Sequence, residues 1–88
     1  MSKRSLQWDA DAWEDYLEWQ QNNKAISKRI NELTTDMLRH PFEGKGKPEG
    51  LKNKLSGFWS RRITEEHRIV YAVEENVIVI VSCKNHYE

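Results

Sequence analysis

The apolar residues of this chain change their spacing near Pro41, which predicts helices before that residue and strands after it. Four apolar residues recur at the three- or four-residue spacing of one helix face, namely Ile26, Ile30, Leu33 and Met37. Residues 77–84 are instead almost continuously apolar and β-branched, as in a central strand covered on both faces. The pattern predicts an α+β fold with the helices in the N-terminal half.

Two antiparallel helices joined by a tight turn are expected after a short strand at residues 5–8. Asp11 is the predicted N-cap of the first helix, with Glu14 as its capping-box partner. Asn23 is expected to cap the second helix. Pro41 ends that helix, because the residue before a proline avoids the helical region.

The second half predicts a loop followed by strands. Residues 41–50 hold both prolines and three of the four glycines, which indicates a loop. A short strand is expected at residues 51–55, and a hairpin from residues 58–64 and 67–74. Together with residues 77–84, these segments predict a twisted, mainly antiparallel sheet of four to five strands, with the helices on one face.

The register of the hairpin decides which residues share a face. Hydrophobic segregation favours a connection with an odd number of residues. Arg62 and Arg68 then lie on the face away from the helices, and Arg61 lies at the edge of the helix-facing set. That set comprises Trp59, Ile63, Ile69, Tyr71 and Val73. Alternation along the last strand places Ser82, Lys84 and His86 on one face.

The length of 88 residues predicts a single domain, residues 1–88. The net charge is zero, but residues 24–68 carry eleven bases and six acids, a local charge of +5. The flanking segments are acidic, with −3 for residues 1–23 and −2 for residues 69–88. This division favours a local anionic ligand over general attraction to nucleic acid.

Several classes of protein and site do not fit the sequence. The single cysteine, Cys83, excludes an intramolecular disulfide and reads as a small buried hydrophobe. No apolar stretch is long enough for a signal peptide or a membrane span, so a cytoplasmic protein without membrane contact is expected. Three scattered histidines and one cysteine match no metal-ligand spacing, and no P-loop is present. We expect neither a metal nor a cofactor.

The basic residues have a structural and a functional interpretation. Arg62 and Arg68 are either ordinary strand arginines paired with neighbouring glutamates, or phosphate ligands beside a lysine-rich loop. Lys45, Lys47 and Lys52 either keep that loop soluble or bind an anion that the adjacent glycines let approach closely.

An acid, an imidazole and two aromatic rings complete the candidates. Glu49 either compensates the lysines or is a general base whose position Pro48 stiffens. His86 can donate a proton near neutral pH, because an unperturbed imidazole has a pKa of about 6.5. Phe58 and Tyr87 are candidates for stacking on a nucleotide.

Three strings carry a family resemblance: PFEGKGKPEGLK, LSGFWSRRITEEHRIVYAV and CKNHY. With the helical half, they resemble the YoeB/Txe type of toxin in the RelE superfamily over nearly the whole chain. The family pattern has proline after the catalytic glutamate, where this chain has Gly50, and Glu88 extends the usual end. The resemblance implies matched roles by position: Glu49 as general base, Arg68 as transition-state arginine, His86 as general acid, Lys52 and Arg62 near the scissile phosphate, and Tyr87 at the edge of the site.

The resemblance also implies an activity and partners. The activity would be metal-independent cleavage of messenger RNA in the A site of the 70S ribosome. A cognate antitoxin of the YefM/Axe type would neutralise the toxin, and a homodimer is left open. The alternative is a non-catalytic RNA-binding or repressor-complex subunit. Glu49, Arg68 and His86 together favour the enzyme, because a binding module needs neither an acid nor an imidazole.

Overall fold

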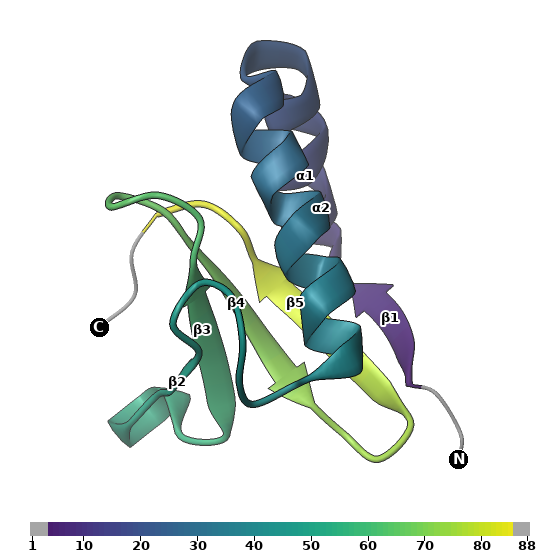
Figure 1. Cartoon of the computed structure of the whole chain (residues 1–88), viewed down its shortest axis with the longest axis vertical. Helices are drawn as coiled ribbons and strands as arrows, with labels where there is room; N and C mark the ends of the chain where they lie inside the picture. The colour runs from purple at the N-terminus through teal and green to yellow at the C-terminus, as the bar shows by residue number, and fades with distance from the viewer. Residues whose placement is uncertain (1–3, 86–88) are drawn as a thin grey trace.

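The computed structural model describes residues 4–85 and shows two helices on one face of a five-stranded sheet (Figure 1). The strand order is β1-β5-β4-β3-β2, with β1 parallel to β5 and the other neighbours antiparallel. The predicted α+β architecture is therefore confirmed. In chain order the elements are β1 (Ser5–Trp8), α1 (Ala10–Asn22), α2 (Lys24–Arg39), β2 (Glu49–Gly50), the 3₁₀ turn η1 (Asn53–Leu55), β3 (Phe58–Arg62), β4 (Arg68–Val73) and β5 (Val77–Ser82).

The helical hairpin follows the predicted stripe. All four stripe residues of α2 are buried in the core between the helices and the sheet. Asn23 caps α2 as expected, since its side chain accepts a hydrogen bond from the Ile26 amide. The helix ends at Arg39, just before the His40–Pro41 pair. Neither helix within residues 4–85 is both long and apolar enough to cross a membrane.

The predicted N-cap of α1 is wrong by two residues. Helix α1 already begins at Ala10, so Asp11 lies in its first turn and Asp9 is the N-cap. The reason is the preceding strand: the Asp9 amide still donates to the Ile80 carbonyl, and the chain turns into the helix at once. The side chain of Asp9 makes no capping hydrogen bond.

The hairpin has the predicted register. Arg62 pairs with Arg68, which leaves five residues, an odd number, in the connection. Ile69 and Tyr71 therefore face the helices and are fully buried. The two arginines lie on the other face, which we call the open face; its residues on β3 and β4 are Phe58, Ser60, Arg62, Arg68, Val70 and Ala72.

Strand β5 departs from the prediction of a strand covered on both faces. Ile78 and Ile80 are fully buried, whereas Val77, Val79 and Val81 are only partly covered. A bulge follows, because Tyr71 pairs with Ile80 but Val70 pairs with Ser82. The extra residue, Val81, shifts the alternation, so that Cys83 rather than Ser82 enters the core.

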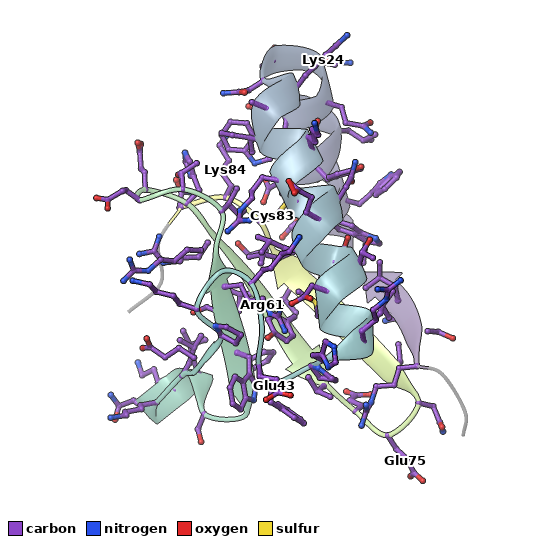
Figure 2. All side chains as sticks on the ribbon, in the orientation of Figure 1. Lys24, Glu43, Arg61, Glu75, Cys83 and Lys84 are labelled. Atoms are coloured by element: carbon purple, nitrogen blue, oxygen red, sulfur yellow. The ribbon has the colours of Figure 1, made fainter. Side chains whose placement is uncertain are left out.

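The strand also ends earlier than expected, at Ser82. The side chain of Lys84 turns to α1, where its Nζ lies 3.0 Å from Oε1 of Glu18 (Figure 2). Ser82 instead pairs with Val70 of the open face, so Ser82 and Lys84 do not share one face as predicted. The third member of that set, His86, lies outside the described residues.

The strand predicted at residues 51–55 is wrong. Pairing with β3 occurs two residues earlier, at Glu49 and Gly50, inside the segment expected to be a loop. The Leu51 amide still bonds to the Phe58 carbonyl, but Asn53 takes a left-handed conformation with φ of 60°. Asn53 is the first residue of the 3₁₀ turn η1, so the chain leaves the extended conformation there.

Candidate active site on the open face of the sheet

The short strand β2 brings Glu49 onto the open face. Glu49 pairs directly with Ser60, and directly paired residues of antiparallel strands project to the same side. Arg62 follows Ser60 by two residues, so it is the diagonal neighbour of Glu49, at a Cα separation of about 7–8 Å. The acid and the arginine predicted from sequence therefore occupy one surface.

Glu49 and Arg62 are exposed, and neither makes a salt bridge within residues 4–85. The interpretation of Arg62 as half of a structural ion pair with a neighbouring glutamate is not supported in this part of the chain. Two opposite charges on one surface remain available to a ligand. Phe58 adds a partly buried aromatic ring to the same face.

Arg68 is held by the loop between β3 and β4. Its Nη1 donates to the carbonyls of Thr64 at 2.8 Å and Glu65 at 2.9 Å. These acceptors are neutral carbonyls, and no carboxylate within residues 4–85 forms a salt bridge with this guanidinium. An arginine has five N–H donors in a rigid fork, so the remaining donors can address an anion on the open face. An orientation fixed in advance is what electrostatic stabilisation of a transition state requires.

The backbone of Arg68 also holds the end of the described chain. Its amide donates to the Asn85 carbonyl at 2.9 Å. The two remaining candidates, His86 and Tyr87, lie outside the described residues, so the structure does not test their placement. It does bring the residue that precedes His86 in the chain directly beside Arg68.

The three candidate lysines are distributed around β2. Lys47 and Lys52 are exposed in the segments that precede and follow this strand. Lys45 instead lines a hollow on the side of α2, together with Lys28, Asn31, Glu32, Thr35, Asp36 and Arg39. The structure thus gathers Glu49, Arg62 and Arg68 on one face and does not bring Lys45 onto it.

Sequence reasoning missed the residue that fixes the loop leading to Glu49. Arg61 was expected at the edge of the helix-facing set, but its side chain is completely buried (Figure 2). Its Nη1 forms a salt bridge of 2.7 Å with Asp36 of α2, and its Nε donates to the Tyr71 hydroxyl. A signal was present: by alternation Arg61 falls between the apolar positions Trp59 and Ile63, and an arginine there needs a buried acidic partner.

The same guanidinium also holds the loop, because it donates hydrogen bonds to the backbone carbonyls of His40, Glu43 and Lys45. The Tyr71 hydroxyl donates in turn to the Pro41 carbonyl at 2.8 Å. Among residues 4–85, every buried side-chain nitrogen and oxygen atom has a hydrogen-bond partner. The path of residues 40–45 is therefore fixed from the core, four residues before Glu49.

Asp36 completes this network. Its carboxylate accepts the Lys45 amide at 2.9 Å as well as the Arg61 guanidinium. The Lys45 amide first, and then Arg61, lower the pKa of Asp36 against the opposing effect of burial. Burial raises the pKa of Tyr71, although its hydrogen bond with Arg61 acts in the other direction. The network thus holds an ionised carboxylate and a neutral phenol.

Cys83 is fully buried, as predicted from sequence. Burial raises the pKa of its thiol to about 12, so almost none is present as the nucleophilic thiolate at neutral pH. The histidines, cysteine and acids of residues 4–85 form no group of three or more that could hold a metal ion. The charged residues that the strand register places on the open face are Glu49, Arg62 and Arg68.

Comparisons with known proteins agree with the family suggested by the sequence strings. A family model described as the YoeB-like toxin of bacterial type II toxin–antitoxin systems matches residues 8–87. Toxin YoeB of Escherichia coli (strain K12) is 61% identical over 82 residues, which cover 93% of this chain and 98% of the relative.

Solved structures support the same assignment. The YoeB dimer from Staphylococcus aureus superposes with a TM-score of 0.90 at 48% identity, covering 98% of this chain and 100% of that one. The YoeB–YefM complex from Staphylococcus aureus gives 0.87 at 49% identity, with the same coverage. YafQ from E. coli strain BL21(DE3), at 13% identity and a TM-score of 0.79 over 96% of this chain and 94% of that one, shares the fold alone.

Proposed function

Because the chain belongs to the YoeB-like toxins of bacterial type II toxin–antitoxin systems, we propose that it cleaves messenger RNA in the ribosomal A site and thereby stops translation. The observation that carries this proposal is the open face, where Glu49, Arg62 and Arg68 lie together. Asn85, the residue before His86, is bonded to Arg68 at the same end of the sheet.

The proposed reaction is attack of a ribose 2′-oxygen on the adjacent phosphorus. Glu49 takes the 2′-hydroxyl proton as the new oxygen–phosphorus bond forms. Arg68, with Arg62 and Lys52, stabilises the charge that develops on the phosphoryl oxygens. His86 gives a proton to the departing 5′-oxygen as its bond to phosphorus breaks. The products are a 2′,3′-cyclic phosphate and a 5′-hydroxyl end, and no metal or cofactor enters any step.

Substrate contacts follow from the surrounding residues. Phe58 presents a ring on the open face, and the family pattern assigns Tyr87 a place at the edge of the site. Lys47 would contact the RNA backbone near β2. Lys45 would contact the RNA from the hollow on the side of α2. The ribosome is expected to supply much of the alignment by ordering the message in a reactive geometry.

Relatives suggest the protein partners. The Staphylococcus aureus YoeB structures include a dimer and a complex with YefM. We infer that this chain likewise binds a cognate YefM-type antitoxin and can form a homodimer. The alternative function, a non-catalytic RNA-binding or repressor subunit, keeps the basic surface but assigns no chemical role to Glu49.

The test is to map cut ends on translating ribosomes with purified protein. Glu49→Ala and His86→Gln should each lower the cleavage rate by about 10²- to 10⁴-fold, the usual contribution of a general base or acid. Glu43→Ala, which removes another exposed loop acid, should cut like wild type. If neither catalytic substitution slows cleavage, the assigned chemistry is wrong; if wild type does not cut at all, the binding-module function is favoured.

A further inference from the structure

Three hydrogen bonds hold the chain immediately before its last three residues. The indole Nε1 of Trp19 donates to the Cys83 carbonyl at 2.9 Å. The Asn85 amide donates to Nδ1 of His67 at 2.9 Å, and the Asn85 carbonyl accepts from the Arg68 amide at 2.9 Å. Helix α1 and the start of β4 thus hold residues 83–85 from two sides.

The hydrogen bond to His67 assigns different roles to its two ring nitrogens. Nδ1 can accept the Asn85 amide only if that nitrogen carries no proton, which leaves Nε2 as the donor of the ring. The ring packs edge-on against Trp19, with centroids 4.8 Å apart and an interplanar angle of 68°. Only 14% of the His67 side chain is exposed, and Nε2 lies 3.9 Å from the Glu66 carboxylate. The imidazole is therefore held in one orientation.

Asn85 depends on these contacts for its conformation. Its φ is 69°, in the left-handed region that asparagine tolerates better than most residues but that still costs energy. Both of its backbone polar groups are hydrogen-bonded to consecutive residues, the amide to His67 and the carbonyl to Arg68. A loss of either bond would remove support for this conformation of Asn85.

We propose that His67 is a positioning residue for the reaction: by accepting the Asn85 amide, its Nδ1 sets the direction in which the chain enters His86. This inference rests on the proposed function, because it assigns His67 a role only through the general acid. His67 would not touch the substrate. The Nδ1 lone pair of His67 would keep the proposed general acid, His86, within reach of the leaving 5′-oxygen. A small misplacement of a catalytic group lowers the reaction rate strongly.

The structural arm of the test compares three substitutions by amide hydrogen exchange and ¹⁵N NMR. His67→Ala removes the acceptor, His67→Asn keeps an oxygen near the position of Nδ1, and His67→Gln moves the polar group toward Nε2. Exchange of the Asn85 amide should be about two- to tenfold faster in the alanine and glutamine variants, the loss of one hydrogen bond. His67→Asn should stay close to wild type, as should the matched control His40→Ala at the exposed end of α2.

The activity arm measures single-turnover cleavage of ribosome-bound message. His67→Ala should slow the rate at saturating protein by about 10- to 100-fold, as expected for a misplaced catalytic group, with little change in affinity for the ribosome. His67→Asn should recover most of the rate. In the His86→Gln background, His67→Ala should cause no further loss, because two residues that act through one step are not additive. A general loss of fold would instead lower affinity and add to the effect of His86→Gln.

The outcomes separate this inference from the proposed function. If His86→Gln abolishes cleavage but His67→Ala keeps both the Asn85 protection and the rate, the inference is overturned and the function stands. Additive losses in the double variant would also overturn it. If the wild-type protein cuts no message, the proposed function fails first, and the exchange data then describe only a structural contact.

Discussion

At the scale of single residues, the hydrophobic core of this protein contains one buried arginine, Arg61, with its polar partners. A buried arginine–carboxylate pair is weak evidence for added stability, because removing two charges from water is costly. Here the pair does something more specific: Arg61 joins α2, β4 and the backbone of residues 40–45. The sequence shows a basic segment, but it does not show which of two adjacent arginines faces inward until the register is fixed. That register assigns Arg61 to the core and Arg62 to the open face.

The two adjacent arginines give a matched test of this assignment. Arg61→Met should lower the free energy of unfolding by about 3–5 kcal/mol, since it leaves Asp36 and several carbonyls without their partner. Arg62→Met should change stability by less than about 0.5 kcal/mol, as is usual for an exposed position. Urea denaturation of both variants measures the difference. Equal effects at the two positions would contradict the buried network.

The lowered pKa of Asp36 predicts a dependence of stability on pH. A carboxyl group with a depressed pKa in the folded state stabilises the protein above its unfolded pKa, here near 3.8, and this contribution is lost as the pH falls through the folded value. The stability gap between wild type and Asp36→Asn should therefore be constant near neutral pH and shrink in acid. Denaturant titrations across this range measure it, and a gap that does not depend on pH would refute the claim.

At the scale of elements, the parts with strong periodicity could be predicted and the irregular parts could not. The stripe of α2 and the hairpin register both follow from alternation of apolar residues. The bulge at Val81 and the early pairing of Glu49 do not, because both depend on hydrogen bonds to other strands. These two irregularities matter for the site: one turns Cys83 inward, and the other places Glu49 on the open face.

Two glycines in the segment before β3 should respond oppositely to alanine. Gly46 has φ of 81°, and an added Cβ would lie 2.8 Å from Leu33, so Gly46→Ala should destabilise the protein by more than about 1 kcal/mol. At Gly50 an added Cβ would meet the Trp59 ring at an ordinary 3.7 Å. Gly50→Ala should then be neutral or stabilise by up to about 1 kcal/mol, by restricting the unfolded chain. Thermal unfolding compares the two, and a reversed order would contradict the described loop.

At the scale of the whole molecule, the helices cover one face of the sheet and leave the other to the candidate chemistry (Figure 1). Sequence patterns predicted this division, and the family strings pointed to Glu49, Arg68 and His86. The Arg61 network and the contacts of Asn85 were not predictable, since both join residues far apart in the chain. They fix the two segments that lead to Glu49 and to His86.

The most direct test of the central claim replaces one hydroxyl group of the substrate with hydrogen. A message carrying a single 2′-deoxyribose at the mapped cut site should bind the ribosome and this protein normally, yet resist cleavage there, because the attacking oxygen is missing. The unmodified message should yield a 2′,3′-cyclic phosphate and a 5′-hydroxyl end. Cleavage of the deoxy-substituted message at the same bond and the same rate would contradict attack by the 2′-oxygen, and with it the role proposed for Glu49.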